Sequence, residues 1–335
     1  MKITECQSFV HLAMSIQTDA TTLNKVFHKR EYNIFKIPKK QKGKWRTIED
    51  PKGDLELVQR RLAKELNQVY EPFLLPSIHG YIPKAICNGA SRDIFSNASA
   101  HLNHDFLLNV DLKDFFHSIT RSMIQERLIE YYSIMPSIAS YIAKIATYKK
   151  RLPMGSPLSP VLSNMMSLKF DENLESIAKE SNLVYTRYVD DITFSGAYDF
   201  KNKLLAVLDK EIVKFSYERN KKKISYYQKS EYSAVTGLLL YPDGTLYPQK
   251  ELLDSIRENI TKLYSLRQTY QNCTALGIQS KTTKRKYKKL KNSIRGQIDF
   301  VERVLGPEDE IVRKLSEDYT ITKNKNHHIA QHVYI

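Results

Sequence analysis

Two adjacent acids lie in the stretch YTRYVDDITFSG, residues 185–196, inside a run of apolar and aromatic residues. The segments LVYTRY and ITFSG are rich in β-branched and aromatic side chains, which favours strands. Only Val189, Asp190 and Asp191 separate them, so we predict a hairpin with both carboxylates at its tip. Neighbouring carboxylates repel each other and are costly to bury without a partner. A cation is therefore expected beside this hairpin.

A third acid, Asp111, follows the segment FLLNV at residues 106–110. This run of apolar or β-forming residues is typical of a strand buried on both faces. Mg²⁺ takes oxygen ligands and completes its shell with substrate phosphates. Asp111 and Asp190, with Asp191 beside them, therefore predict a site for two Mg²⁺ ions about 4 Å apart that promotes in-line phosphoryl transfer. The alternative is an ordinary acidic turn and a helix cap, but a bare acidic turn gains nothing between apolar strands.

The composition is that of a folded protein that meets a polyanion. Hydrophobic residues make up 41% of the 335 residues and charged residues 27%, which predicts an ordered chain with more than one subdomain. The 52 Lys and Arg residues against 37 Asp and Glu favour a nucleic-acid partner over an uncommitted basic surface. The apolar runs are too short to span a bilayer, and the start MKITECQSFVHLAM lacks a signal-peptide core, so we expect a cytoplasmic protein without a membrane partner.

Periodicity and turn residues predict the order of the elements. A helical lead-in, short strands, a helix and the buried strand come first, and a group of helices precedes the hairpin. The expected ranges are a lead-in at 1–30, strands at 37–54, helices at 54–73, 121–132 and 136–149, a helix from the Gly-Ser-Pro loop at 155–157, a helix at 201–217, a strand pair around the Pro-Asp-Gly turn at 242–244, and helices over 249–320.

Several motifs resemble those of a known family. NVDLKDFF, LPMGSPLSPVLSN and YVDD occur in the order and spacing of the palm motifs of reverse transcriptases, and NASAH (97–101) and VTG (235–237) resemble elements typical of bacterial retron reverse transcriptases. The resemblance implies an α+β right-hand polymerase. Its parts would be a helical lead-in and fingers at 1–105, a ferredoxin-like βαββαβ palm at 106–240 with 120–150 folding toward the fingers, and a basic helical thumb at 241–335.

The resemblance also assigns roles in the reaction. Asp111 and Asp190 resemble the metal ligands, with Asp191 as the second acid of the pair, and Lys223 resembles the lysine that protonates the departing pyrophosphate. Because Lys223 lies in the charged run NKKK, a solvated lysine is an equally good interpretation.

Further residues resemble the nucleotide-binding set. Phe116 matches the steric gate that excludes a ribonucleotide, although a core phenylalanine is the alternative because Phe115 is adjacent. The residues expected to hold the incoming nucleotide are Lys44, Arg46, Arg92, Phe116 and Gly155. The family commonly has glutamine where this chain has Met154, and a thioether cannot donate a hydrogen bond, so any contact of that glutamine is absent.

RNA binding is expected from two regions. The stretch 281–306 interleaves basic and apolar residues as a helical pair with a basic face, although a solvated basic helix is the alternative. The alternative is that Asn97 is a helix cap and His101 a structural histidine. Thr236-Gly237 could likewise be a turn at the end of a strand. The expected RNA-binding residues are Asn97, His101, Val235, Thr236, Gly237, Lys284, Arg285, Lys288 and Lys289.

The retron resemblance implies a particular substrate and set of partners. The enzyme would copy its own structured noncoding RNA (msr-msd) from a 2′-OH primer with dNTPs and make branched msDNA. Host RNase H would remove the template, and a separate effector protein would act with the enzyme in phage defence. The alternatives are a group II intron-type or other bacterial reverse transcriptase, and a nucleic-acid-binding protein with an inactive palm. The last alternative predicts the loss of at least one of the three aspartates, and all three are present.

Overall fold

The computed structural model describes residues 1–39, 43–228, 232–275 and 281–322. The chain divides into two compact units, Met1–Ser230 and Glu231–Ile335. The three-domain division expected from the sequence stays a prediction, and the boundary between compact units falls ten residues before the expected start of the thumb at 241. No helix within the described ranges is long and apolar enough to cross a membrane.

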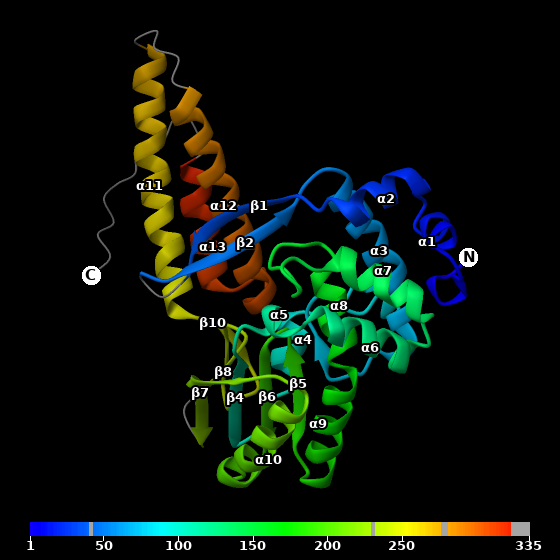
Figure 1. Cartoon of the computed structure of the whole chain (residues 1–335). Coiled ribbons are helices and arrows are strands. Elements are labelled where there is room, and N and C mark those ends of the chain that lie inside the picture. Colours follow the sequence, from blue (N-terminus) through cyan, green and yellow to red (C-terminus); the bar gives the residue numbers. More distant parts are fainter. Residues whose placement is uncertain (40–42, 229–231, 276–280, 323–335) are drawn as a thin grey trace. The chain divides into compact units, whose positions relative to one another are not determined.

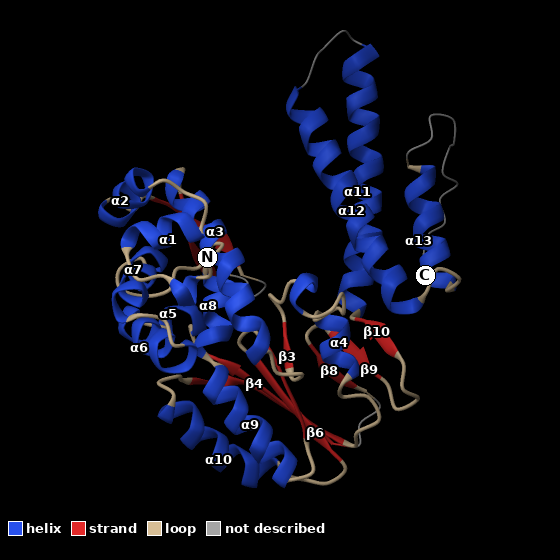
Figure 2. Cartoon of the chain, turned by 90° about the vertical axis from the view of Figure 1, so that its right-hand side faces the viewer, coloured by secondary structure: helices blue, strands red, loops and turns tan. Residues whose placement is uncertain are grey.

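A five-stranded sheet in the order β3-β5-β6-β4-β7 forms the centre of the first unit (Figure 1). Its strands are β3 (Ile78–His79), β4 (Phe106–Leu112), β5 (Val184–Tyr188), β6 (Asp191–Gly196) and β7 (Arg219–Gln228). Helices α9 (Leu168–Glu180) and α10 (Lys201–Lys214) cover one face of the sheet in both views (Figures 1 and 2). The four antiparallel strands β4 to β7, with these crossovers, have the βαββαβ order of a ferredoxin-like palm, which confirms the predicted fold class.

Strand β4 is central and is almost entirely buried, as its apolar run predicts. It pairs antiparallel with β6 on one side and with β7 on the other. Leu108 and Val110 are at most 1% exposed, and burial of each such side chain contributes about 1.5–3 kcal/mol to folding. This rigid strand continues through Asp111, so the acid lies within the strand and not after it.

Helices and a two-stranded hairpin complete the first unit and share one apolar core with the sheet. The hairpin consists of β1 (Tyr32–Pro38) and β2 (Trp45–Pro51). The helices are η1 (Ile3–Glu5), α1 (Phe9–Ser15), α2 (Ala20–His28), α3 (Asp54–Tyr70), η2 (Glu71–Phe73), η3 (Lys84–Ile86), α4 (Ile94–Ser99), α5 (Phe115–Ser118), α6 (Arg121–Tyr132), α7 (Pro136–Ala146) and α8 (Ser159–Met166).

Two expected helices end earlier than their apolar periodicity suggests. Helix α7 stops at Ala146 because Thr147 is extended, and Lys149 and Lys150 then adopt left-handed backbone conformations and reverse the chain. Helix α10 stops at Lys214, and Ser216 turns the chain in the same way. Such reversals have little sequence signal, because neither lysine nor serine is typical of positive φ.

Of the two Ser-Pro pairs in the Gly-Ser-Pro loop, only the second begins a helix. Helix α8 starts at Ser159 with Pro160 in its first turn. The hydroxyl of Ser156 instead donates to Gln59 Oε1 at 2.7 Å and accepts from the Leu158 amide at 3.1 Å. Ser156 therefore binds the loop to α3 through Gln59 and does not cap α8.

The second unit combines a small sheet with three helices. Its strands are β8 (Ser233–Val235), β9 (Leu238–Leu240) and β10 (Leu246–Pro248), in the order β10-β9-β8. Its helices are α11 (Lys250–Ala275), α12 (Lys281–Leu305) and α13 (Glu310–Ile321), which meet around Ile256, Ile294 and Leu315. The expected strand pair is thus a three-stranded sheet, and the expected pair of basic helices at 281–304 is the single helix α12.

Candidate active site

The sheet brings the three predicted acids to one end. Asp111 on β4 lies directly opposite Asp191, the first residue of β6. The amide of Leu112 donates to the carbonyl oxygen of Asp190 at 2.9 Å, which fixes the turn against β4. The predicted acidic hairpin is present, although its turn is only two residues long because Asp191 already pairs with Tyr188.

Crowding raises the pKa of both turn acids. The protein atoms around Asp190 desolvate its carboxylate and raise its pKa, and the charge of Asp111 adds to this effect. Asp191 reaches solvent but is desolvated by its surroundings, and with the charges of Asp190 and Asp111 its pKa rises to about 7. Ionisation of Asp190 and Asp191 is thus unfavourable, and a positive charge close to them would make it favourable.

Lys223 on β7 supplies part of that charge. Its Nζ lies 2.5 Å from Asp111 Oδ1, and Asn220 Nδ2 donates to the other carboxylate oxygen, Oδ2, at 3.0 Å. The pairing of β4 with β7 shifts register just here, and over this irregular stretch both side chains reach Asp111. Desolvation alone would lower the pKa of Lys223, but the bond to Asp111 and the three aspartate charges outweigh it, so the pKa is raised.

The donor set fits a hard divalent cation. Among the described residues, no three Asp, Glu, His or Cys side chains are already arranged to bind a metal ion. Asp111 forms an ion pair with Lys223. The oxygens of Asp111, Asp190 and Asp191 are nevertheless the kind that Mg²⁺ prefers, and the raised pKa values of Asp190 and Asp191 favour a cation beside them. A metal ion that binds Asp111 through Oδ1 would displace the lysine ammonium from that oxygen.

Phe116 and Phe115 have different surroundings. Phe115 is 2% exposed, and its ring packs against Tyr217 in the core. Phe116 is half-buried, and its ring lies 6.2 Å from that of Tyr81, centroid to centroid. Tyr81 is a half-exposed aromatic residue at positive φ whose pKa is raised by burial and by the charge of Asp190. Phe116 and Tyr81 therefore form an aromatic pair on the side of the site near Asp190.

Gly155 is required by the fold itself. A Cβ at this residue would lie 2.8 Å from Ile48 Cγ2 and 3.3 Å from the carbonyl oxygen of Glu49, and φ is +121°. The amide of Glu49 donates to the carbonyl oxygen of Met154 at 2.7 Å, which holds β2 on this loop. The absence of a side chain at Gly155 therefore lets strand β2 pack closely against this loop.

The three expected triphosphate contacts lie in different settings. The charge of Arg46 on β2 acts on both Asp190 and Tyr81. Lys44 is exposed just before β2. The guanidinium of Arg92, in contrast, donates to the carbonyl oxygen of Pro76, and its own carbonyl oxygen accepts from the amide of Gly80. Arg92 therefore has a clear structural task, whereas Arg46 is exposed on β2 and its charge partly offsets the rise in the pKa of Asp190.

Asn97 and His101 are both buried, and His101 fits its interpretation as a structural histidine. Asn97 lies within α4, whose N-cap is Asp93, so its interpretation as a helix cap is wrong. Asn97 is 0% exposed and His101 is 2% exposed. The two ring nitrogens of His101 contact Ser195 Oγ on β6 and Thr186 Oγ1 on β5, each at 2.7 Å. Burial lowers the pKa of His101 to about 3, so the ring is neutral and joins the two strands of the acidic hairpin. Neither side chain is accessible to RNA in this conformation.

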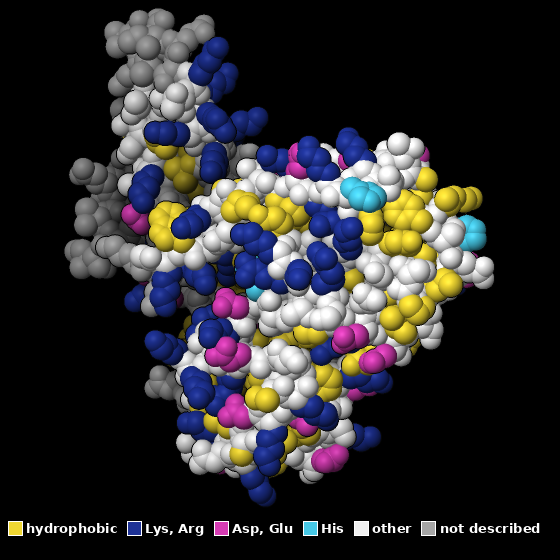
Figure 3. Space-filling view, in the orientation of Figure 1, with side chains coloured by type: hydrophobic (Ala, Val, Ile, Leu, Met, Phe, Trp, Pro, Cys, Tyr) yellow, Lys and Arg dark blue, Asp and Glu magenta, His cyan; other side chains and the backbone are white. Residues whose placement is uncertain are grey.

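The expected RNA-binding residues of the second unit lie at its surface, with one exception. Val235 is buried at the end of β8. Thr236 and Gly237 both have positive φ and form the two-residue turn between β8 and β9. Lys284, Arg285, Lys288 and Lys289 are exposed on α12. Figure 3 shows Lys and Arg side chains gathered along the visible face of this helix.

Three residues near the site had no role in the sequence analysis: Tyr81, Asn220 and Arg187. Asn220 could have been found, because it is the first residue of the same four-residue NKKK segment that ends in Lys223. Tyr81 and Arg187 had no such signal, because their contacts come from segments far apart in the chain.

Comparison with known proteins agrees with this geometry. A ferredoxin-like palm that carries its acids on β4 and at the β5–β6 turn defines a polymerase of the right-hand class. The family model "Reverse transcriptase (RNA-dependent DNA polymerase)" matches residues 37–280, so the chain belongs to the reverse transcriptase family.

Several of the relatives are retron enzymes. The chain is 29% identical over 228 residues to the retron Mx65 reverse transcriptase of Myxococcus xanthus, covering 62% of this chain and 51% of that protein. It is 33% identical over 170 residues to the retron Ec86 reverse transcriptase of Escherichia coli, covering 49% of each. The chain thus spans about half the length of these relatives. The resemblance to bacterial retron reverse transcriptases is confirmed.

One solved structure is a telomerase. The structure of telomerase from Candida albicans in complex with a fragment of telomeric RNA superposes with a TM-score of 0.49 and 11% identity, over 89% of this chain and 64% of that one.

Proposed function

We propose that this protein is a cytoplasmic RNA-directed DNA polymerase that extends a primer with dNTPs in the presence of two Mg²⁺ ions. The observation that carries the proposal is the meeting of Asp111, Asp190 and Asp191 with Lys223 at one end of the palm sheet. The family match supports a nucleic-acid template. An inactive palm is disfavoured because the backbone holds each acid in place: Asp111 and Asp191 pair across β4 and β6, and the Asp190 carbonyl oxygen accepts from the amide of Leu112.

The residues of the site supply what nucleotide addition needs. The primer hydroxyl oxygen forms a bond to the α-phosphorus, the bond from that phosphorus to the bridging oxygen breaks, and the hydroxyl proton leaves to solvent. Mg²⁺ held by the aspartates would acidify the hydroxyl and neutralise the pyrophosphate. Lys223 carries a proton at Nζ at neutral pH, as any lysine with an ordinary or raised pKa does, and it would donate this proton to the departing pyrophosphate. Arg46 contributes positive charge to the side of the site near Tyr81.

We expect Phe116→Ala to admit ribonucleotides, because the half-buried ring borders the site and a methyl group leaves room for a 2′-OH. A change of about 10–100-fold in the ratio of dNTP to rNTP incorporation is expected, since steric exclusion of one small group is worth about 1–3 kcal/mol. Primer extension with each nucleotide class measures it.

Phe115→Leu is the matched control for this prediction. Phe115 is buried in the core, so this variant should lose thermal stability and keep its sugar preference. If Phe116→Ala discriminates as well as the wild-type enzyme, the gate lies elsewhere, and Tyr81 becomes the next residue to substitute.

The finer proposal is that the enzyme belongs to a retron. It would copy its own msr-msd RNA from a 2′-OH primer into msDNA, with host RNase H removing the template, and would serve in phage defence with a separate effector protein. The retron relatives and the NASAH and VTG elements support this proposal. The buried His101 gives NASAH a part in holding the hairpin, so we assign RNA choice to the Thr236-Gly237 turn, where Thr236 is half-buried and Gly237 exposed. The basic helix α12 would supply affinity for any RNA.

We expect Thr236→Asp to weaken binding of the cognate RNA selectively. Both turn residues have positive φ, and Asp-Gly is among the pairs favoured there, so the turn should persist while a negative charge faces the RNA. We expect a loss of about 10–100-fold in affinity for the locus RNA, since a single charged contact is worth about 1.5–3 kcal/mol. Extension of a generic annealed primer should change little.

Thr236→Asn keeps the turn without the charge and is the control for backbone effects. Affinities for the locus RNA and for a scrambled hairpin, each measured in parallel, decide the matter. Equal affinity of the wild-type protein for both RNAs would remove the retron proposal and leave a general bacterial reverse transcriptase.

A further inference from the structure

A buried ion pair lies directly behind the acidic turn. Arg187 on β5 and Asp171 on α9 are both 0% exposed. Arg187 Nε lies 2.7 Å from Asp171 Oδ1, and Nη2 lies 2.6 Å from Oδ2, a bidentate pair. Burying two charges is costly even when they are paired, and apolar residues of similar size often stabilise such a place better. The pair therefore needs an explanation other than stability.

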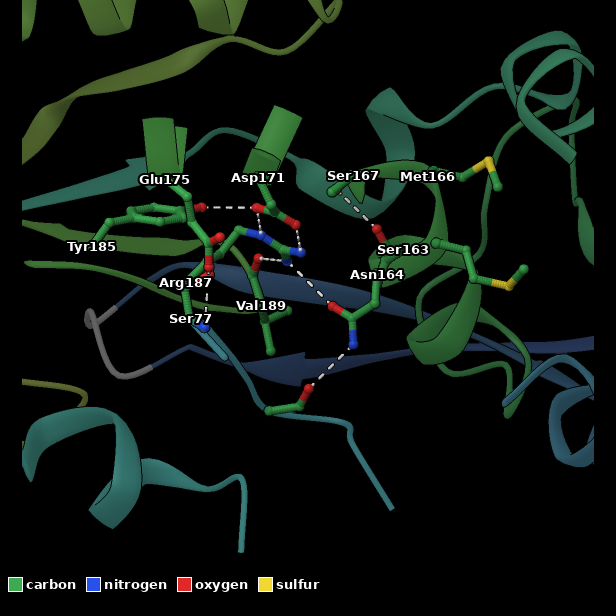
Figure 4. Close-up of polar contacts among 12 residues, drawn as sticks. Ser77, Ser163, Asn164, Met166, Ser167, Asp171, Glu175, Tyr185, Arg187 and Val189 are labelled. Carbon is green, nitrogen blue, oxygen red and sulfur yellow. Dashed lines mark hydrogen bonds and ion pairs between the residues drawn. The ribbon is translucent and has the colours of Figure 1, made fainter. Parts of the chain in front are cut away.

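The remaining guanidinium nitrogen reaches the turn itself. Arg187 Nη1 donates to the carbonyl oxygen of Val189 at 2.9 Å and to Asn164 Oδ1 at 3.3 Å. Asn164 Nδ2 in turn donates to the carbonyl oxygen of Gly80 at 3.3 Å. Figure 4 shows these bonds running from Asp171 through Arg187 to Val189 and Asn164. One guanidinium thus links α9, α8, the acidic turn and the residue before Tyr81.

Val189 is the strained residue of this turn. Its φ is +61°, a left-handed conformation that is a clear outlier for a β-branched side chain. A two-residue hairpin with positive φ at its first central residue normally has Gly, Asn or Asp there, and not a β-branched residue. The next residue is Asp190, whose carbonyl oxygen accepts from Leu112 on β4. The bond from Arg187 to the Val189 carbonyl therefore fixes the peptide whose orientation sets the direction of Asp190.

We propose that Arg187, anchored by Asp171, is a positioning residue that holds Val189 in its left-handed conformation and so aims the carboxylates of Asp190 and Asp191. Through Asn164 the same guanidinium fixes the Gly80 carbonyl and with it the start of the loop that carries Tyr81. The catalytic consequence rests on the proposed polymerase function, whereas the positioning itself does not.

Lysine cannot replace arginine in this role, although it keeps the charge. An ammonium is a point donor, whereas the planar guanidinium bonds Asp171 with one edge and the Val189 carbonyl with another. Arg187→Lys should therefore retain the ion pair and lose the bridge to the turn. Misplacement of reacting groups by about 1 Å can cost about 10²-fold, so we expect the rate of nucleotide addition to fall by about tenfold or more. The loss should be in kcat, with a smaller change in KM for dNTP.

Hydrogen exchange provides a readout that does not depend on activity. In Arg187→Lys the amide of Leu112 and the peptide covering Val184–Gly196 should exchange at least about tenfold faster than in the wild-type protein, because the turn opens locally. The helices α3 and α7 should exchange as before. An inactive wild-type enzyme would refute the proposed function and leave this measurement valid.

Val189→Gly provides the decisive rescue. Glycine adopts positive φ without strain, so the turn of the Val189→Gly variant no longer needs the arginine to hold it. Arg187→Lys should reduce the rate by about tenfold or more in the wild-type background, but by no more than about threefold in the Val189→Gly background. Equal losses in the two backgrounds would overturn the proposal, whatever Val189→Gly costs alone.

Two further variants keep the test interpretable. Tyr185→Phe removes the hydroxyl that donates to Asp171 Oδ1 at 2.8 Å from the same strand and leaves every bond of Arg187, so it should lower the melting temperature and leave kcat unchanged. If Arg187→Lys does not fold, Arg187→Lys with Asp171→Glu restores the summed length of the pair without the bridge, and the same exchange and rescue measurements apply. Unchanged exchange at the turn in a folded variant without the bridge would contradict the proposal.

Discussion

Asp190→Asn and Asp111→Asn are each expected to lower the rate of nucleotide addition by at least about 10³-fold, since each removes a carboxylate that would hold a metal at the reacting phosphate. Both acids lie at the end of the palm sheet and not on the basic helix α12. RNA affinity should therefore stay within about threefold of the wild-type value. Single-turnover primer extension and a gel shift on the same preparations measure the two effects.

The two substitutions should differ in their effect on the fold. Asp111 accepts from Lys223 and Asn220 and is 6% exposed, so Asp111→Asn breaks an ion pair and lowers the melting temperature. Asp190 is repelled by Asp111, so Asp190→Asn relieves this repulsion and should leave stability unchanged or raise it. Loss of activity with opposite changes in stability would separate a chemical role from misfolding.

Asp54→Asn is the matched control for removal of a carboxylate. Asp54 forms an exposed pair with Lys25, and such pairs contribute little to stability. This variant should extend primers like the wild-type enzyme. Substantial extension by Asp190→Asn or Asp111→Asn would contradict the assignment of these acids as metal ligands.

The parts of the site that could be predicted are those encoded locally. The acidic hairpin follows from two β-rich segments with three residues between them, and the burial of β4 follows from its apolar run. Local strand propensity and the requirement to bury apolar side chains agree in both cases, so the sequence alone was sufficient. The choice between Phe116 and Phe115 stayed open in the sequence, and the structure leaves Phe116 half-buried while Phe115 is 2% exposed.

The parts that could not be predicted depend on contacts between distant segments. Arg187 resembles an ordinary strand residue until α9 supplies Asp171, which lies 16 residues earlier in the chain. The sequence left His101 open between RNA binding and a structural role, because its partners, the hydroxyls of Ser195 and Thr186, lie 94 and 85 residues away. Gly155 was expected to admit a nucleotide, and only the structure shows that β2 occupies the space beside it.

The largest expected effect on RNA binding comes from neutralising α12. Lys284, Arg285, Lys288 and Lys289 are exposed, and their spacing of one and four residues places them on one face of the helix. Removal of each phosphate contact should reduce the log–log dependence of affinity on salt by about 0.7–0.9. Replacing all four with Gln should therefore reduce the slope of log affinity against log salt by about 3. If the variant and the wild-type protein bind equally at 1 M salt, this change weakens binding by about 10³-fold at 0.1 M salt.

The control must remove the same charge elsewhere. Lys169, Lys203, Lys210 and Lys214 are exposed on α9 and α10, and their replacement by Gln also removes four positive charges from the chain. If α12 follows the phosphate backbone, the α12 variant loses affinity and slope for every RNA, whereas the control changes both only slightly, because exposed charges more than about 10 Å from the RNA are screened at 0.1 M salt. Because backbone contacts carry no sequence information, the α12 variant should keep the preference for the locus RNA that Thr236→Asp loses. Equal losses in the two fourfold variants would mean that net charge, and not this helix, attracts the RNA.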